Sequence, residues 1–539
     1  MDLLHRIRGW VMPLLSLFTL ASALLGLGLK VWPPVFLTLA AGGAALLLLG
    51  TYDLLQKRHS LLRNYPVIGH LRFLLESAGP EIRQYFVESN TSGRPFNRDA
   101  RDLMYRRAKG IEAVKPFGTE LDVYGYGYGF ISHSAKPRPA VVDPGRNLRV
   151  TVGGPDCEHP YSASLLNISA MSFGALSANA VLALNEGARE GGFAHNTGEG
   201  GLSTHHQKPG GDLIWQVGTG YFGCRDDQGN FSPELFREQA ALPQVKMIEL
   251  KLSQGAKPGH GGILPGAKVS AEIAAARKVP QGEDCFSPPG HSAFSTPTGL
   301  LDFIVELREL SGGKPVGFKL CVGDPREFYA ICKAMLETGI TPDFITVDGG
   351  EGGTGAAPPE FSDHLGYPLR EGLLLVHNAL VGTNLRDRIK IAASGKRFAS
   401  YEMASALALG ADWCNVARGF MFSLGCIQSQ LCGTNLCPVG VATQKPRLQK
   451  AIVPEEKGER VFLFHQATLA GLAETTAACG LGHPEEFEPI HLYERTTPHQ
   501  VRRFDQLYDF LEPGELLGEE IPESVSPFWQ TARADRFER

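Results

Sequence analysis

Several features are missing from this sequence, and each absence excludes a class of protein. No long run of lysine or arginine occurs and the formal net charge is -5, so the sequence does not predict a nucleic-acid partner. Only 10 of the 539 residues are cysteine, and most are scattered through apolar stretches. We therefore expect reduced thiols instead of a disulfide framework.

Charged residues are absent from two stretches near the N-terminus, residues 9–29 and 31–52. Each is long enough to cross about 30 Å of hydrocarbon as a helix. Only Lys30 and a Pro33–Pro34 turn separate them, which predicts a transmembrane hairpin over residues 1–55. Basic residues flank the hairpin on both outer sides, so both flanks are expected to face the cytoplasm. These flanking residues are His5, Arg6, Arg8, Lys57, Arg58, Arg63 and Arg72.

The competing interpretation of the first stretch is a signal peptide, because "ASA" at 21–23 resembles a cleavage site. The apolar run is too long for that, and a second run follows directly. We therefore predict a water-soluble body, residues 55 to 539, tethered to a lipid bilayer at the cytoplasmic face of the inner membrane.

From about residue 165, short apolar stretches end in Gly, Ser, Asn or Asp, and most are followed by an amphipathic helix pattern. Eight such units predict an α/β fold, a parallel (β/α)8 TIM barrel. The alternative, an open doubly wound sheet, prefers a G-x-G-x-x-G turn after its first strand, and none is present. The predicted strands lie within 166–172, 193–201, 213–223, 247–255, 316–323, 344–355, 389–396 and 413–420, and helices include 177–191, 299–311, 324–339 and 398–410.

Polar residues gather where the predicted strands end, which is where the active site of such a barrel lies. They are Asn196, Glu199, Lys251, Gln254, Lys257, Asp348 and Lys396. Glycine-rich turns at 348–355, 393–396 and 417–420 lie at the ends of the last three strands. Together with the charges of Lys396 and Arg418 they predict a phosphate site.

Cationic side chains near the fourth strand suit a dicarboxylate, because such a ligand needs fixed positive charges. Lys251, Gln254 and Lys257 follow one another at intervals of three, and Arg277 adds a third cation. A solvated basic loop is the alternative, most of all for Lys257. Glu199 either handles protons or caps a loop.

Three cysteines lie close together as C-x5-C-x4-C: Cys426, Cys432 and Cys437, with Pro438 directly after them. Small buried side chains in a loop are one interpretation. A zinc site is another, although zinc would want a fourth ligand. His205 and His206 lack partners at ligand spacing, so we interpret them as a loop pair.

Five ordered motifs resemble the FMN-binding synthase domain of glutamate synthase, over roughly residues 140 to 450, and residues 60–140 resemble its shorter stand-alone members. The motifs are "SAMSFGALS" (169–177), "NTGEGG" (196–201), "KLSQGAKPGHGGILPGAKV" (251–269), "DGGEGGTGAAP" (348–358) and the cysteine triplet with "PVGVATQ".

The resemblance implies an FMN cofactor lying over the strand ends. Met171, Ser172 and Phe173 are expected behind the ring, and the phosphate at Gly395, Lys396, Arg418 and Gly419. The other expected cofactor-binding residues are Asn196, Lys319, Asp348, Gly349, Gly350, Gly352, Gly353 and Ser394. The expected catalytic residues are Glu199, Lys251, Gln254, Lys257 and Arg277.

The reaction implied by the resemblance is the reductive amination of 2-oxoglutarate. In the family, 2-oxoglutarate and ammonia form 2-iminoglutarate, and reduced FMN delivers hydride to the imine carbon to give L-glutamate. The resemblance also implies that Cys426, Cys432 and Cys437 ligate a [3Fe-4S] cluster that passes electrons to FMN. A metal-free variant with relict cysteines is the alternative.

The sequence departs from the large glutamate synthases, because their glutaminase domain and C-terminal β-helix are not expected here. Residues 451–539 are instead predicted as a helical extension, with helices that include 497–511, and residues 56–145 as a helical and extended segment packing on the 146–450 barrel. We expect a separate ammonia source such as a partner glutaminase. The electron donor would be a ferredoxin, an NAD(P)H-dependent reductase or a quinone.

Two other functions remain open at this point. One is a flavin amine oxidoreductase or N-alkylglutamate synthase on the same barrel. The other is a non-catalytic electron-transfer or scaffold protein.

Overall fold

A computed structural model describes residues 10–28 and 33–538 of the chain. His5, Arg6, Arg8 and Lys30, on which part of the membrane prediction depends, lie outside the described residues. The chain divides into two compact units, Met1–Arg98 and Asp99–Arg539.

The first unit begins with two apolar helices that pack against each other, α2 (Val11–Gly28) and α3 (Pro33–Leu55). Both are long and apolar enough to cross a membrane, and most of their residues are exposed. The expected turn at Pro33 and Pro34 is wrong, because both prolines lie in the first turn of α3. Proline suits this position, since the first amides of a helix have no partner within it.

A buried carboxylate joins the end of α3 to the segment that follows. Asp53 accepts a hydrogen bond from the Val67 N–H at 2.9 Å and pairs with His70 Nε2 at 3.0 Å. The start of the next long helix is therefore fixed to the hairpin formed by α2 and α3. The elements of this segment are α4 (Ser60–Asn64), α5 (Gly69–Ile82) and the π-helical η1 (Arg83–Val87).

The second unit contains a closed barrel of eight strands in the order β4, β5, β6, β7, β10, β11, β12 and β13. All neighbouring pairs are parallel, so every strand ends on the same rim. The predicted TIM barrel is confirmed. Its strands are β4 (Leu166–Ile168), β5 (His195–Asn196), β6 (Leu213–Val217), β7 (Val245–Lys251), β10 (Val316–Leu320), β11 (Phe344–Asp348), β12 (Lys390–Ser394) and β13 (Trp413–Val416).

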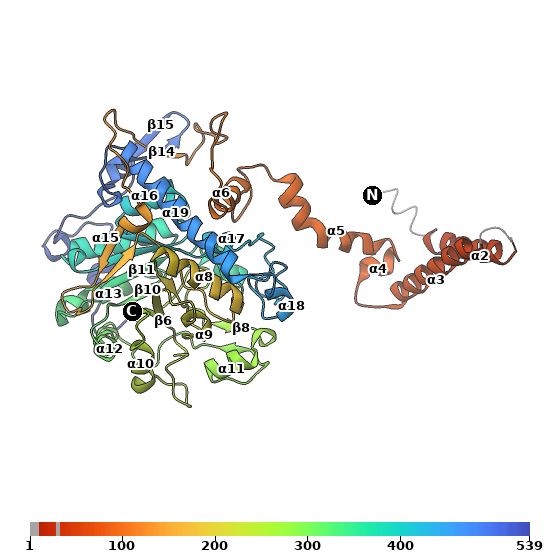
Figure 1. Cartoon of the computed structure of the whole chain (residues 1–539), viewed down its shortest axis with the longest axis horizontal. Helices are drawn as coiled ribbons and strands as arrows, with labels where there is room; N and C mark the ends of the chain where they lie inside the picture. The colour runs from red at the N-terminus through yellow and green to blue at the C-terminus, as the bar shows by residue number, and fades with distance from the viewer. Residues whose placement is uncertain (1–9, 29–32, 539) are drawn as a thin grey trace. The chain divides into compact units, whose positions relative to one another are not determined.

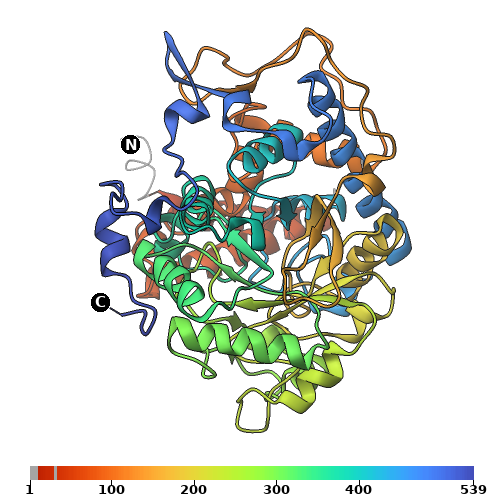
Figure 2. The same cartoon turned by 90° about the vertical axis from the view of Figure 1, so that its left-hand side faces the viewer.

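Helices cover the outside of the barrel strands (Figures 1 and 2). The first begins where the sequence predicts, because the Ser177 hydroxyl caps it by accepting a hydrogen bond from the Ala180 N–H. The helices between β4 and the end of the barrel are α8 (Ala178–Gly191), α9 (Thr204–Gln207), α10 (Pro233–Ala240), α11 (Ala271–Arg277), α12 (Pro297–Leu310), α13 (Pro325–Thr338), α14 (Pro359–His364), α15 (Leu369–Gly382), α16 (Ser400–Ala408) and α17 (Arg418–Ser423).

A long helix after the barrel, α19 (Pro454–Ala478), packs on α8 as part of the predicted helical extension. The two helices approach closely because glycines face each other's helix: an added Cβ at Gly458 would lie 2.8 Å from Glu186 Cγ. Further short elements of the second unit are α6 (Arg98–Ala108), α7 (Pro144–Asn147), η2 (Gly266–Lys268), η3 (Arg386–Arg388), α18 (Pro446–Gln449), η4 (Pro484–Glu486), η5 (Pro489–His491), α20 (Phe504–Leu507), η6 (Glu515–Leu517) and α21 (Ser526–Thr531).

The prediction of one helix over residues 497–511 is confirmed only for Phe504–Leu507 (α20), and its first part is wrong. Strands β14 and β15 form a hairpin there, and β14 pairs with β1 in a three-stranded antiparallel sheet. Pro498 lies in the turn, where proline is tolerated, and the Tyr493 ring stacks on Phe130 at 5.1 Å. The remaining strands are β1 (Gly129–Ile131), β2 (Arg149–Val152), β3 (Tyr161–Ser164), β8 (Ile263–Leu264), β9 (Cys285–Phe286), β14 (Leu492–Thr497) and β15 (Gln500–Arg503).

Candidate active site

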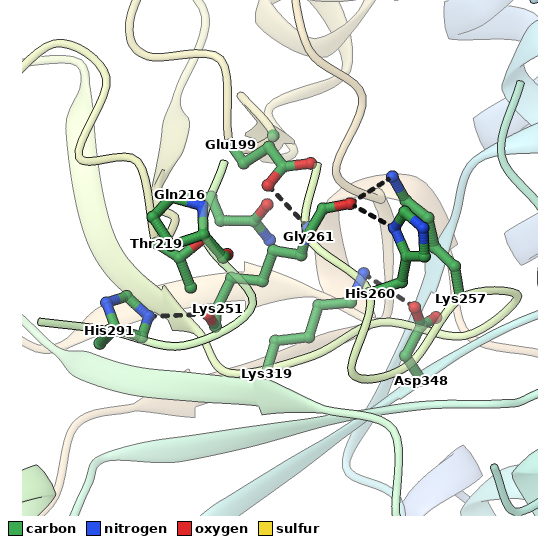
Figure 3. Close-up of polar contacts among 12 residues, drawn as sticks. Glu199, Gln216, Thr219, Lys251, Lys257, His260, Gly261, His291, Lys319 and Asp348 are labelled. Carbon is green, nitrogen blue, oxygen red and sulfur yellow. Dashed lines mark hydrogen bonds and ion pairs between the residues drawn. The ribbon is translucent and has the colours of Figure 1, made fainter. Parts of the chain in front are cut away.

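The carboxyl ends of the barrel strands hold an ion pair between two of the predicted catalytic residues. Lys251 is the last residue of β7, and its Nζ lies 2.8 Å from Oε2 of Glu199, in the loop after β5 (Figure 3). Burial alone would raise the pKa of Glu199, but Lys251, Lys257 and Arg277 hold that pKa below its usual value. Glu199 is therefore a carboxylate surrounded by three cations at neutral pH.

Lys257 is the second cation near Glu199, and its side chain is buried. Its Nζ donates a hydrogen bond to the Gly261 carbonyl at 3.2 Å, an acceptor that it shares with His260 (Figure 3). Burial lowers the pKa of Lys257, with Glu199 opposing and the like charge of Lys251 adding to the effect. Within the described part of the chain, Lys257 forms no direct ion pair, and a neutral carbonyl accepts its hydrogen bond. Gln254, in the same loop, is half-buried.

The side chain of Arg277, the last residue of α11, is fixed by a backbone carbonyl and an aromatic ring. Its Nη2 donates to the Phe173 carbonyl at 3.0 Å, and its guanidinium lies 5.0 Å from the centre of the Phe222 ring. It therefore acts on Glu199 through its charge, and it also fixes the segment Met171–Phe173 after β4. Met171 and Phe173 are buried and Ser172 is half-buried.

A second ion pair joins neighbouring strands of the barrel. Lys319 Nζ lies 3.1 Å from Asp348 Oδ2, and the same carboxylate oxygen accepts the Gly255 N–H at 2.9 Å (Figure 3). Burial lowers the pKa of Lys319, but Asp348, Glu249 and Glu199 outweigh it and raise that pKa above its usual value. Lys319 is thus a fixed ammonium beneath the rim.

The structure adds a carboxylate that the sequence analysis missed, Glu249 on β7. It is fully buried and accepts hydrogen bonds from Asn196 Nδ2 at 2.8 Å, Gln216 Nε2 at 2.6 Å and Thr346 Oγ1 at 2.7 Å. These donors lie on β5, β6 and β11, so one anion links four strands inside the barrel. The signal in the sequence was a polar residue in the middle of an apolar strand, as in "MIELK" and "LIWQV".

His291 is a further missed residue beside the ion pair of Lys251. Its Nε2 lies 2.8 Å from the Lys251 carbonyl and its Nδ1 3.1 Å from the Tyr221 hydroxyl. Burial lowers the pKa of His291 to about 4, so the ring is neutral at pH 7. The neutral ring holds the end of β7 in place without adding charge.

The predicted phosphate residues lie at the ends of β11, β12 and β13. The Ser394 hydroxyl lies 3.1 Å from that of Ser169, and Lys396 follows it after Gly395. The Arg418 guanidinium fills the space that a side chain at Gly353 would need. The other glycines of this group are Gly349, Gly350, Gly352 and Gly419, at the same strand ends.

Arg418 lies between this rim and the cysteine loop. Burial lowers the pKa of Arg418, while the charges of Asp348, Cys432 and Cys426 oppose that shift. The guanidinium is therefore within electrostatic reach of a rim carboxylate and of two cysteines at once.

The three cysteines of the triplet lie in one loop after α17 and influence one another. Burial, with smaller contributions from Cys432 and Cys437, raises the pKa of Cys426 to about 11. Lys268 is close enough to interact electrostatically with both Cys432 and Cys437. Within residues 10–28 and 33–538, no three His, Cys, Asp or Glu side chains stand at the distances of a metal site.

His205 and His206, which we interpreted as a loop pair, lie in the short helix α9. His206 Nδ1 lies 2.8 Å from the hydroxyl of Ser203, and His205 Nε2 lies 2.8 Å from Glu272. Both side chains therefore have structural partners.

Comparison with known proteins identifies the family. The family model described as the conserved region in glutamate synthase matches residues 155–482, more than half of the chain, including all eight barrel strands. The chain belongs to the glutamate synthase family.

Curated members of this family differ in how much of their length matches the chain. The glutamate synthase large subunit-like protein YerD of Bacillus subtilis (strain 168) is 40% identical over 492 residues, which cover 84% of this chain and 93% of that protein. An archaeal glutamate synthase (NADPH) of Methanocaldococcus jannaschii is 36% identical, over 59% of each chain. The glutamate synthase (NADPH) large chain of Bacillus subtilis is 31% identical over 61% of this chain but only 21% of its own. The region that matches the family thus corresponds to only part of the length of the larger enzymes.

Solved structures align with the chain at low sequence identity and low TM-score. A mutant flavocytochrome b2 with pyruvate bound aligns with a TM-score of 0.41 and 12% identity, over 84% of this chain and 92% of that one. A mandelate oxidase mutant with (S)-mandelic acid aligns with a TM-score of 0.40 and 13% identity, over 75% and 97%. TM-scores this low support no conclusion about this member of the glutamate synthase family.

Proposed function

We propose that this chain is an FMN-dependent glutamate synthase-type oxidoreductase that converts 2-oxoglutarate and ammonia to L-glutamate. The observation that carries the proposal is the group of three cations, Lys251, Lys257 and Arg277, around the carboxylate of Glu199. Fixed cations of this kind favour an anionic substrate such as a dicarboxylate. The family membership of the chain supports the same reaction class.

The residues at the strand ends fit FMN by their chemistry. Lys396 and Arg418 supply positive charge for a phosphate, and the hydroxyls of Ser169 and Ser394 supply hydrogen bonds at the same corner. The buried segment Met171–Phe173 offers an apolar surface for the ring. When bound, FMN supplies the hydride that reduces the substrate's imine carbon.

Proton transfer and substrate binding are assigned to side chains of the ion pair and its neighbour. Lys257 binds a substrate carboxylate, because among residues 10–28 and 33–538 a neutral carbonyl, and no carboxylate, accepts its hydrogen bond. Glu199 stays ionised and accepts a hydrogen bond from the ammonia nitrogen. Lys251 donates one proton to the carbonyl oxygen of 2-oxoglutarate and regains a proton from the ammonia nitrogen. A second proton from that nitrogen goes to the oxygen, so that the carbonyl and ammonia give the imine and one water. Gln254 and Arg277 are assigned to orienting the substrate and the loop around it.

The cysteine triplet is proposed to hold a [3Fe-4S] cluster. Three thiols in one loop provide the ligand set. Burial raises the pKa of Cys426 and of Cys432, while Arg418 opposes that rise at both thiols and Lys268 opposes it at Cys432. The place of Arg418 between this loop and the rim supports a short path for electrons toward the flavin.

Electrons and ammonia come from outside this chain in our proposal. The donor is a ferredoxin, an NAD(P)H-dependent reductase or a membrane quinone, and ammonia arrives free or from a partner glutaminase. The helices α2 and α3 anchor the enzyme in the inner membrane with its barrel in the cytoplasm, as their length, apolar composition and exposure support.

Flavin reoxidation tests the proposed reaction. The full chain, purified in detergent and loaded with FMN, is reduced without oxygen and then mixed with 2-oxoglutarate, ammonium or both. We expect the oxidised flavin absorbance to return, and glutamate to form, only when both are present. Reoxidation that requires methylammonium instead of ammonium would favour the N-alkylglutamate alternative, and no reoxidation by any pair would refute the proposal.

A matched pair of variants ties the result to the site. Lys257→Gln is expected to weaken 2-oxoglutarate-dependent reoxidation, whereas Lys208→Gln, at an exposed lysine of the same unit, is expected to leave it unchanged. Equal effects of both substitutions would contradict the assigned role of Lys257.

A further inference from the structure

The helical segment that follows the hairpin, α5 and η1, has an apolar face that the described residues leave exposed. Large apolar side chains occur along it at spacings of three, four and seven, which place them on one side of a helix. They are strongly exposed: Leu71 by 55%, Leu74 by 64%, Leu75 by 55%, Ile82 by 42%, Tyr85 by 51% and Phe86 by 85%. Such a continuous exposed stripe marks an interaction surface.

The other side of the same segment is polar and charged. Arg72 pairs with Glu76 at 2.8 Å across one helical turn, and Arg83 lies 3.6 Å from Glu88. Ser77 is exposed on this side as well. Polar and charged residues prevail on this side, where Phe73 and Val87 are exposed as well, by 38% and 71%. The segment has 19 residues, which corresponds to about 28 Å of helix.

The position of α5 is fixed relative to the hairpin within the first unit. The buried Asp53 of α3 holds the backbone N–H of Val67 and the ring of His70, the second residue of α5. The Gln56 side chain closes the intervening turn through the His59 backbone N–H and carbonyl. A helix clamped in this way to the end of a membrane-spanning helix starts at the level of the lipid headgroups.

We propose that α5 and η1 lie on the bilayer surface as an interfacial helix, with the apolar stripe in the acyl region and the polar side toward the cytoplasm. The proposal rests on the membrane anchorage proposed above. Tyr85 and Phe86 at the far end suit the headgroup boundary. Lys57, Arg58 and Arg63 in the connecting segment add attraction to anionic lipids.

A second copy of the chain is the competing occupant of the stripe. Pro80 lies inside α5 and removes one backbone donor there, and the π-helical turn Arg83–Val87 changes the angle between successive residues. Knobs-into-holes packing between two helices requires a constant repeat, which this segment does not keep. A lipid surface accepts such irregularity because it has no fixed holes.

Tryptophan substitution in the full chain tests this surface. Leu74→Trp places a reporter on the apolar stripe, and Ser77→Trp is the matched control on the polar side. The proteins are reconstituted in vesicles of phosphatidylcholine and phosphatidylglycerol whose acyl chains are brominated, and the emission of the unsubstituted chain is subtracted.

We expect the added emission of Leu74→Trp to shift to shorter wavelength and to be lost in brominated vesicles, whereas that of Ser77→Trp stays unshifted and unquenched. A shifted but unquenched Leu74→Trp would show that protein covers the stripe and would overturn the proposal. So would equal quenching at both positions.

The failure of the anchorage has a different signature. Trp10, beside α2, is quenched in the unsubstituted chain if the hairpin is in the bilayer. Quenching of the native emission without that of Leu74→Trp would leave the anchorage intact and refute the interfacial helix. Absence of both would refute the two together.

Discussion

At the scale of single residues, the candidate site depends on charges that lie far apart in the sequence. Glu199 and Lys251 are separated by 51 residues, yet the closed barrel brings their side chains to 2.8 Å. Both are largely removed from water, so each charge depends on the other. This mutual dependence makes the pair sensitive to substitution and to pH.

Glu199→Gln is expected to lower the free energy of unfolding at pH 7 by about 3 kcal/mol, because it leaves the buried Lys251 without its partner. The folded-state pKa of Glu199 is lowered, so its contribution is complete above the unfolded pKa of about 4.3 and is lost as the pH falls below it. Thermal unfolding in detergent at pH 7 and pH 4 measures this. The difference from the unsubstituted chain is expected to shrink at pH 4. Glu190→Gln, at an exposed carboxylate, is the control, and an equal loss there would contradict the argument.

Lys257→Gln is expected to raise the KM for 2-oxoglutarate about 10- to 100-fold, the value of a hydrogen bond to a charged group. Burial lowers the pKa of Lys257, so its ammonium loses its proton at a lower pH than an ordinary lysine, whose pKa is about 10.4. The KM of the unsubstituted enzyme is therefore expected to rise with pH before an ordinary lysine titrates, and that of Lys257→Gln to show no such rise. Steady-state kinetics over alkaline pH measures both, and parallel pH profiles would argue against a binding role.

At the scale of elements, the sequence predicts the strands of the barrel well but not what lies between their side chains. The eight strands were visible because each apolar run ends in small or polar residues, as in "IAAS" before Gly395. The Glu249 contacts were not predictable, because helices separate all four participating strands along the chain, and the lengths of those helices do not fix which side chains meet. The β14–β15 hairpin was missed because its pairing partner, β1, lies more than 350 residues earlier.

Glu249→Gln tests whether the anion inside the barrel joins its strands. The substitution turns one acceptor oxygen into an amide that faces donors, and we expect a loss of about 2 kcal/mol in the free energy of unfolding. Glu238→Gln, at an exposed residue of α10, is expected to stay within about 0.5 kcal/mol of the unsubstituted chain. Denaturant titration measures both, and a neutral Glu249→Gln would show that hydrogen bonding there is replaceable.

The cysteine loop is the element on which electron relay depends in our proposal. Cys437→Ser is expected to remove the bound iron and the broad brown absorbance while flavin bands remain. Cys157→Ser, at a cysteine whose Sγ lies 3.4 Å from the Gly313 carbonyl, is expected to change neither. Iron content and visible spectra of the two purified variants provide the measurement, and an unsubstituted protein free of iron would favour the relict-cysteine interpretation.

At the scale of the whole molecule, an enzyme family with soluble reaction partners is combined with a hydrophobic hairpin. Exposed leucines cover α2 and α3, and a water-soluble protein rarely leaves so many of them uncovered. The length of the two uncharged runs predicts this hairpin from the sequence alone, because no tertiary contact is needed to recognise an uncharged helix of that length. In our proposal, substrate turnover takes place beside the membrane, where a quinone or a membrane-bound reductase is within reach.

Membrane extraction tests this anchorage directly. The full chain is expected to stay with membranes after a wash in alkaline carbonate and to be released by detergent. The double variant Leu17→Arg with Leu20→Arg places two charges on exposed positions of α2, each unfavourable in the bilayer centre by about 3 kcal/mol, and is expected to appear in the soluble fraction. Leu336→Arg, at an exposed leucine of α13 in the barrel unit, is the matched control and is expected to remain with membranes. Because the barrel is a separate unit from the hairpin, the released double variant should still reoxidise its flavin with 2-oxoglutarate and ammonium. Release of all three proteins by carbonate would mean that the hairpin does not span the membrane.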